Sequence, residues 1–152
     1  MPDPAAAPST STTDRELYAS RLLPSTREQV FAAFVDPGRL ARWWGPRGFR
    51  NTFTECDPRP GGLWRFVMHG PDGRDFPNEC LFADIDPPSR IVIRHLSAPR
   101  FDLEVTLVEE GTWTRVAWTQ RFETAEVCQQ VRPVAGPGNE QNLERLQAEV
   151  QG

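Results

Sequence analysis

Few side chains in this sequence could carry acid–base or metal chemistry. The chain has two histidines, His69 and His95, and three cysteines, Cys56, Cys80 and Cys128. The cysteines form no CxxC pair, and neither histidine stands at metal-ligand spacing from a cysteine. The sequence therefore predicts no metal site and no cofactor. It also predicts three reduced thiols in a cytoplasmic protein, not a disulfide framework.

His95 is the one candidate for a catalytic role. It shares a face of a predicted strand with Ile91 and Ile93. A histidine on an apolar face is either a hydrogen-bonded core residue or a functional group that orients a ligand or acts as a general base. No Ser-His-Asp set and no pair of carboxylates on an apolar face can be assembled from the sequence. The sequence alone therefore assigns no enzymatic activity.

Large aromatic side chains alternate along two predicted strands. Trp64, Phe66 and Met68 share one face of the first strand, and Trp118 and Gln120 share one face of the second. Such faces either pack a core or line a cavity. A buried indole N–H usually has a hydrogen-bond partner, so we expect Gln120 to accept from Trp118 or to meet a ligand.

Composition excludes several classes of function. The 152 residues carry a net charge of −4 and no lysine, which argues against a nucleic-acid partner. No apolar run approaches the roughly 20 residues that span a bilayer, so no membrane insertion is expected. Residues 1–14 are rich in Pro, Ala, Ser and Thr and predict a disordered leader. Residues 15–150 are expected to form a single domain.

Periodicity and turn signals predict an ordered series of elements. A first strand is followed by two short helices, one capped by Ser25 with Glu28 and the other by Asp36 before Pro37. Six strands then precede a C-terminal helical segment, which Pro133 and the glycines at 136 and 138 are expected to divide into Thr124–Val131 and Asn139–Val150. The predicted strands are Arg15–Leu23, Phe49–Asp57, Leu63–His69, Phe76–Asp86, Arg90–Leu96, Phe101–Val108 and Thr112–Phe122.

This order predicts an α+β helix-grip fold. A curved antiparallel sheet must cover its apolar face, and the C-terminal helix is the element long enough to lie across it. The space between a curved sheet and a helix is a natural ligand cavity. The residues that we expect to bind a ligand there are Trp64, Phe66, Met68, His95, Phe101, Leu103, Trp118, Gln120 and Leu143.

Several phrases of the sequence resemble a known family. The chain is similar to the helix-grip (SRPBCC) superfamily of START, birch-pollen-allergen and polyketide-cyclase-like domains. Within it, the chain resembles the stand-alone bacterial branch named after the C-terminal domain of the activator of the Hsp-type chaperone ATPase. The phrases are Val30–Phe34 with Asp36-Pro37, Trp43–Pro46, Gly61-Gly62, Met68–Gly73, Pro77-Asn78, Asp86–Val92 and Gly138–Leu146.

The resemblance implies the fold and leaves three functions open, because members of this superfamily differ in activity. The first is binding of a small apolar or amphipathic molecule. The second is an enzyme of the polyketide cyclase or hydrolase type that uses the same cavity. The third is a protein-interaction module, either homodimeric or chaperone-related. The chain lacks the co-chaperone's separate N-terminal domain and a GxxxxGK[ST] phosphate loop, which argues against chaperone contact and ATPase activity.

Overall fold

One antiparallel sheet of seven strands forms the body of the protein. The computed structural model describes residues 14–151, so the predicted leader lies, except for its last residue, outside the described residues. The strands follow the order β1-β7-β6-β5-β4-β3-β2, with β1 and β2 at the two edges. Their bounds are β1 Glu16–Leu23, β2 Arg50–Cys56, β3 Leu63–His69, β4 Asp75–Asp86, β5 Arg90–His95, β6 Phe101–Glu110 and β7 Trp113–Phe122.

Two short helices connect the edge strands β1 and β2. Helix α1 spans Arg27–Val35 and helix α2 spans Pro37–Trp43. The Asp36 side chain caps α2 and Pro37 occupies its first turn, as the sequence predicts. The cap of α1 differs from the prediction: Thr26 and Gln29 form the capping box, one residue later than Ser25 and Glu28. Ser25 is buried, and its carbonyl accepts a 2.7 Å hydrogen bond from Thr114.

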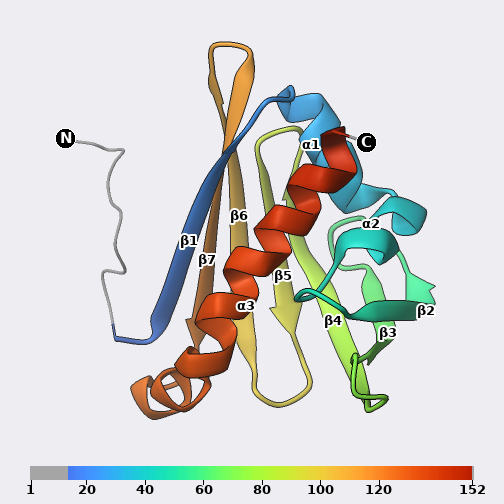
Figure 1. Ribbon diagram of the computed structural model, residues 1–152, viewed down its shortest axis with the longest axis vertical. Helices are drawn as coiled ribbons and strands as arrows, with labels where there is room; N and C mark the ends of the chain where they lie inside the picture. The colour runs from blue at the N-terminus through green and yellow to red at the C-terminus, as the bar shows by residue number, and fades with distance from the viewer. Residues whose placement is uncertain (1–13, 152) are drawn as a thin grey trace.

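The C-terminal segment is one helix, α3, over Ala125–Gln151, and the predicted division into two pieces is wrong. Pro133 and Pro137 each remove one intrahelical hydrogen bond, which normally ends or kinks a helix. Tertiary packing compensates at both ends. Cys128 packs against Leu17 and Phe122, and further along the helix Leu143 and Leu146 enter the main core. The opening turns of α3 run in a different direction from the remainder, as Figure 1 shows.

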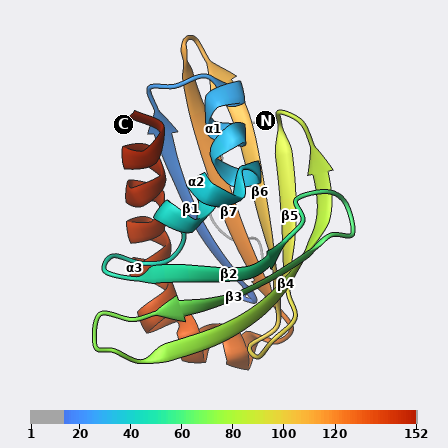
Figure 2. The same ribbon diagram turned by 90° about the vertical axis from the view of Figure 1, so that its right-hand side faces the viewer.

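Helix α3 lies across the concave face of the sheet, as Figures 1 and 2 show from two sides. The sheet curves so that β2, β3 and the far end of β4 fold toward the viewer in Figure 2. The inner face of the sheet and the three helices share one apolar core. The predicted helix-grip architecture, with two short helices after the first strand, is therefore confirmed.

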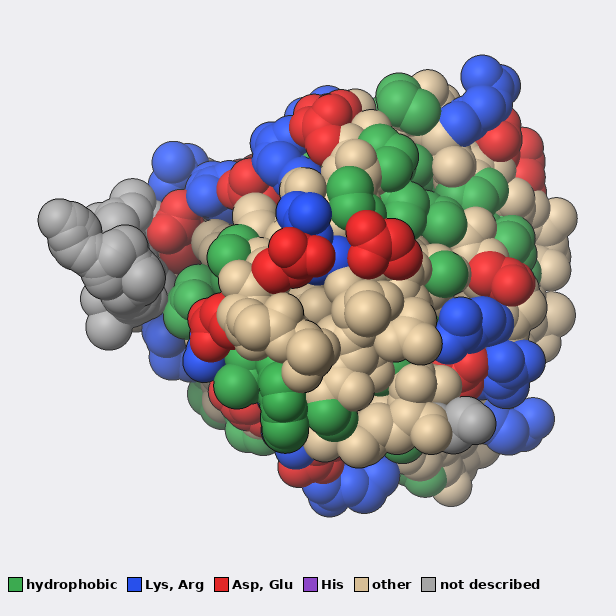
Figure 3. All heavy atoms as spheres, turned by 90° about the horizontal axis from the view of Figure 1, so that it is seen from above, with side chains coloured by type: hydrophobic (Ala, Val, Ile, Leu, Met, Phe, Trp, Pro, Cys, Tyr) green, Lys and Arg blue, Asp and Glu red, His purple; other side chains and the backbone are tan. Residues whose placement is uncertain are grey.

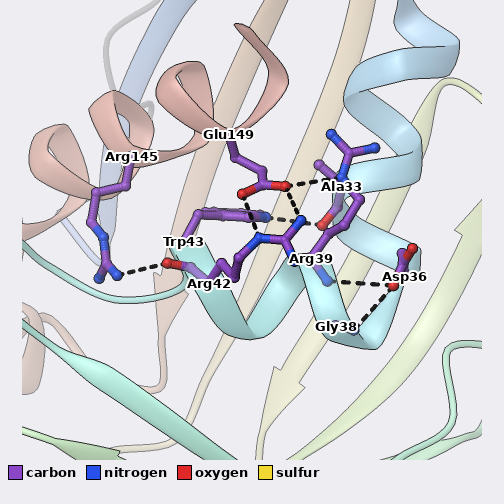
Figure 4. A network of polar contacts seen from close by, with 8 residues as sticks. All are labelled: Ala33, Asp36, Gly38, Arg39, Arg42, Trp43, Arg145 and Glu149. Carbon is purple, nitrogen blue, oxygen red and sulfur yellow. Dashed lines mark hydrogen bonds and ion pairs between the residues drawn. The ribbon is translucent and has the colours of Figure 1, made fainter. Parts of the chain in front are cut away.

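An ion-pair cluster joins the C-terminal end of α3 to α2 (Figure 4). Both Glu149 carboxylate oxygens accept from Arg42, at 3.1 and 2.7 Å, and one also accepts from Arg39 at 3.0 Å. The hydrogen bond from Arg42 lowers the pKa of Glu149, and Arg39 adds to this effect while burial opposes it. The cluster therefore fixes the angle at which α3 crosses the small helices.

Acid should selectively weaken this cluster. A carboxyl with a lowered pKa in the folded state stabilises the protein above its ordinary pKa of 4.5, and this contribution is lost as the pH falls through the folded-state value. We expect Glu149→Gln to be less stable than the parent chain at pH 7 and the difference to shrink below pH 4.5. Urea unfolding at pH 7 and at a pH below 4.5 measures the stability difference between the two chains. Glu140→Gln is an exposed control on the same helix. A difference that is the same at both pH values would contradict the prediction.

The outer face of the sheet carries cross-strand ion pairs. Arg90 pairs with Asp84 and Glu104, and Arg94 pairs with Asp102 across β5 and β6. At the end of the molecule that holds the β6–β7 hairpin and α1, acidic and basic side chains are interspersed with hydrophobic ones (Figure 3). Over residues 14–151, none of the helices is both long and apolar enough to cross a membrane.

Candidate ligand cavity

A cavity of about 260 Å³ lies between the sheet, the α2–β2 loop and α3. It is slightly smaller than the roughly 300–1,000 Å³ that is usual for ligand sites. Strands β3–β7 supply most of its apolar surface, and α3 closes the opposite side. The lining residues are Trp44, Gly45, Pro46, Phe66, Met68, Asn78, Cys80, Ile93, His95, Phe101, Leu103, Trp118, Gln120, Val134, Ala135, Gly138, Asn139 and Asn142.

Seven of the nine residues expected to bind a ligand line this cavity, namely Phe66, Met68, His95, Phe101, Leu103, Trp118 and Gln120. The other two, Trp64 and Leu143, are fully buried in the core and do not line it. The Trp64 ring stacks between Phe66 and Phe82, at centroid distances of 4.4 and 5.5 Å. The register of β3 therefore turns Trp64 inward as predicted, but neighbouring rings separate it from the open space.

The sequence predicts that Trp43 and Trp44 anchor the small helices and that one of them gates the cavity, and Trp44 is the one in the lining. The lining residues Asn78, Asn139 and Asn142 were not predicted. The sequence signal for Trp44 was the phrase Trp44-Gly45-Pro46. In the structure Gly45 has a φ of +99°, which L side chains rarely adopt. A Cβ atom there would also lie 2.7 Å from the methyl carbon of Met68. The positive φ therefore favours glycine at position 45, and a larger residue would displace the end of the Met68 side chain. Asn139, expected as a helix cap, lies within α3 and points its amide at β7.

Both ring nitrogens of His95 face oxygen atoms. Nδ1 lies 2.8 Å from the Pro99 carbonyl, and Nε2 lies 2.6 Å from Asn78 Oδ1. The ring also stacks on Phe101 at 4.5 Å between centroids. A neutral imidazole donates through one nitrogen only. Nε2 can donate to Asn78 Oδ1, whose amide group in turn donates to the Phe76 carbonyl at 2.8 Å, and the Ser97 hydroxyl also lies 3.4 Å from Nε2. His95 is thus held on both sides and on one face by groups of the protein itself.

Burial lowers the pKa of His95, and backbone hydrogen bonds with Pro99 and Ser97 partly oppose this shift. Because the pKa of the folded protein lies below the ordinary 6.5, the unfolded chain binds the proton first as the pH falls. We expect stability to decline below pH 6.5, with a slope of at most about 1.4 kcal/mol per pH unit for this one group. Urea titrations between pH 7.5 and 5 measure the slope. His95→Gln should flatten it; equal slopes in the parent and His95→Gln would contradict the assignment.

Gln120 and Asn139 connect the sheet to α3 at the cavity wall. Asn139 Nδ2 donates to Gln120 Oε1 at 2.9 Å. Gln120 is only 8% exposed, and its Nε2 group has no hydrogen-bond partner among residues 14–151. The expected bond from the Trp118 indole to Gln120 does not form, and Trp118 Nε1 is buried without a partner. Gln120 therefore offers the cavity an unused donor.

Cys80 is the other titratable group in the lining. Burial raises the pKa of its thiol to about 12, with the nearby charge of Glu79 adding to the effect. A thiol with such a pKa is protonated at neutral pH and is a poor nucleophile. Cys80 therefore behaves as a small apolar side chain, and the same holds for Cys56, whose pKa burial raises to about 11.

Three side chains hold the α2–β2 loop against the cavity. Arg145 Nη1 donates to the carbonyls of Trp44, Gly45 and Pro46, and its Nη2 donates to the Arg42 carbonyl, all at 2.9–3.1 Å. Two further carbonyls of α2 accept side-chain hydrogen bonds. Asn51 Nδ2 donates to the Ala41 carbonyl, and Asn142 Nδ2 donates to the Trp43 carbonyl. These bonds satisfy the acceptors that a helix end leaves unpaired. Figure 4 shows the Arg145 side chain reaching from α3 to the Arg42 carbonyl in α2.

A second polar chain lies on the outer face of the sheet. His69 Nε2 lies 2.8 Å from the Thr52 hydroxyl, and His69 Nδ1 lies 2.8 Å from an Asp75 carboxylate oxygen. The order of atoms matches a hydroxyl–imidazole–carboxylate triad, a set that sequence reasoning did not assemble. Thr52 and Asp75 are exposed, however, and none of the three lines the cavity. The chain of bonds cross-links β2, β3 and β4.

The curved sheet and the helix that crosses it define a helix-grip domain of the SRPBCC type. The fold is shared with solved structures from several bacteria. A protein from Arthrobacter aurescens matches with a TM-score of 0.86 and 22% identity, covering 94% of this chain and 91% of that one. A protein from Rhodobacter sphaeroides matches with a TM-score of 0.79 and 27% identity, covering 91% and 93%.

The family model for Activator of Hsp90 ATPase homolog 1-like protein matches residues 24–151, so the chain belongs to this family. The AHSA1 protein of Silicibacter pomeroyi has the same fold, with a TM-score of 0.72 and 20% identity over 90% of this chain and 97% of that one. No curated protein matches the chain. The predicted resemblance is therefore confirmed at the level of family and fold.

Proposed function

We propose that this protein binds a small, mainly apolar molecule in the cavity between the sheet and α3. The observation that carries the proposal is the cavity itself, a space of about 260 Å³ in an otherwise packed core. Its walls include the faces of Trp44, Phe66, Phe101 and Trp118. Burial of apolar surface against them would supply the affinity, at about 25 cal/mol per Å². The family's helix-grip fold is compatible with this role.

The two alternative functions have less support. An enzyme of the cyclase or hydrolase type needs a free acid or base in the cavity, and both nitrogens of His95 are engaged. An interaction module needs a contiguous apolar surface. The large apolar side chains that are exposed come from five separate elements: Tyr18, Phe76, Val108, Trp113 and Val134.

A pair of glycines in α3 provides a matched test. Gly138 lines the cavity, and a Cβ atom added there would lie 3.7 Å from the Pro46 ring. Gly136 does not line the cavity and has open space around its Cβ position. Leucine at either position removes the same glycine penalty of about 1 kcal/mol in a helix. We therefore expect Gly138→Leu to narrow the cavity entrance and Gly136→Leu to leave it unchanged.

The measurement is calorimetric titration with indane, an uncharged two-ring hydrocarbon. We expect the parent chain and Gly136→Leu to bind it alike and Gly138→Leu to bind it at least tenfold more weakly. Thermal melts of the three proteins check that the fold is retained. Failure of the parent chain to bind indane, or equal binding by both leucine variants, would overturn the proposal.

A further inference from the structure

The cavity lining contains no carboxylate and no guanidinium group. All eighteen of its residues lie within the described chain, and the titratable ones are His95 and Cys80. Burial shifts both toward the uncharged form, because it lowers the pKa of His95 and raises that of Cys80. At neutral pH the walls therefore carry no net charge, although a quarter of the residues of the whole chain are charged.

Two arginines near the lining residues in the sequence are already bound elsewhere. Arg145, the α3 arginine closest in sequence to the lining residue Asn142, donates to four backbone carbonyls of α2 and the following loop. Arg94, which precedes His95, turns to the outer face and pairs with Asp102. A charged ligand would lose its hydration in this cavity without gaining a counter-ion, which is strongly unfavourable.

The amide side chains of the walls also differ in which of their hydrogen-bonding atoms remain free. The oxygens of Asn78 and Gln120 are engaged, by His95 and Asn139 respectively. The Nε2 group of Gln120 has no partner within the described chain, and Gln120 is more than nine-tenths buried. Gln120 Nε2 is not one of the fully buried side-chain atoms that lack a partner, so an acceptor brought by a ligand can reach it and form a hydrogen bond. Trp44 and Trp118, stacked at 5.7 Å, place flat apolar surface in the same lining.

We propose that the ligand is an uncharged ring compound with a carbonyl-type oxygen, which accepts a hydrogen bond from Gln120 Nε2. This inference rests on the proposed binding function and narrows its ligand to one chemical class. It separates the cavity from sites for fatty acids, phosphates or amines, each of which would require an ionised partner in the walls. Gln120 sets the orientation of the ligand, and the aromatic walls select its shape.

Four compounds on one skeleton test the class: indane, 1-indanone, indane-1-carboxylate and 1-aminoindane. Calorimetric titration at pH 7.5 should give 1-indanone the lowest Kd, up to tenfold below that of indane, since one net hydrogen bond contributes at most about a factor of ten. The carboxylate and the ammonium compound should bind at least a hundredfold more weakly than 1-indanone.

Variants at two adjacent positions of β7 test the role of Gln120. Gln120→Leu should abolish the preference for 1-indanone over indane while retaining indane binding. Gln120→Glu should introduce binding of 1-aminoindane. Thr119→Val, whose side chain lies on the opposite face of the same strand, should change none of these values.

The outcomes distinguish this inference from the proposed function. If indane binds but the carboxylate binds as tightly as 1-indanone, the inference is overturned and the binding function stands. An unchanged preference for 1-indanone in Gln120→Leu would also overturn the role of Gln120. If the parent chain binds none of the four compounds, the proposed function itself fails. The comparison on the parent chain needs no variant to fold.

Discussion

Trp118→Ala is expected to lower the free energy of unfolding by about 4 kcal/mol, within the range of roughly 3–5 kcal/mol for large aromatic side chains. The Trp118 side chain is 2% exposed and stacks on Trp44 with ring centroids 5.7 Å apart. It also contacts Trp43 edge-on at 6.4 Å. Alanine leaves these neighbours facing an enlarged cavity. In a chain of this size the loss corresponds to a melting temperature about 8–16 °C lower, measurable by calorimetry.

Trp118→Phe is the matched comparison for this prediction. The indole Nε1 of Trp118 is buried without a hydrogen-bond partner, so phenylalanine removes an unsatisfied donor and keeps an aromatic face. We expect it to cost about 1 kcal/mol or less. Phenylalanine and alanine variants with equal losses would show that the indole N–H, and not the packed ring, contributes most of the stability at this position.

Arg145→Ala is expected to cost about 3 kcal/mol, since hydrogen bonds from a charged group contribute roughly 1.5–3 kcal/mol each and solvent replaces part of this loss. One guanidinium holds four carbonyls, at Arg42, Trp44, Gly45 and Pro46. No carboxylate shares the interaction, and burial lowers the pKa of the Arg145 guanidinium. The loop that forms one cavity wall should therefore loosen. Urea unfolding measures the loss, and amide exchange at Gly45 measures the loop.

Arg145→Lys separates charge from geometry at this position. An ammonium group is a compact donor and cannot reproduce the planar fork that reaches the helix end and the loop together. We expect lysine to recover less than half of the lost stability and to leave Gly45 exchanging faster than in the parent chain. Full recovery by lysine would show that positive charge near the end of α2, acting on the helix dipole, suffices.

The sequence determined the order and type of the elements. Apolar residues two apart placed Trp64 and Phe66 on the inner face of β3, and the Asp36-Pro37 pair marked the start of α2. These signals are local, because strand alternation and helix caps depend on neighbouring residues. The ordered phrases of the sequence also indicated the family that the matching model identifies.

The course of α3 was decided by tertiary packing. Two prolines and two glycines within six residues predict a broken helix from local preference alone. Contacts of Cys128 with Leu17 and Phe122, from the paired strands β1 and β7, hold one end of α3 in place. Leu17 lies more than a hundred residues from Cys128 in the sequence, so local patterns cannot reveal this contact.

The candidate site also combines features that the sequence predicts with features that only the tertiary structure shows. The sequence showed which side chains face the concave side of the sheet, including His95 and Gln120, since that depends on alternation along a single strand. Only the tertiary structure decided that Trp64 is enclosed by other rings while Trp44 reaches the cavity, and that Asn78 and Pro99 occupy both nitrogens of His95. Whether a buried face is packed or open depends on side chains that α3 and the α2–β2 loop bring from distant parts of the chain.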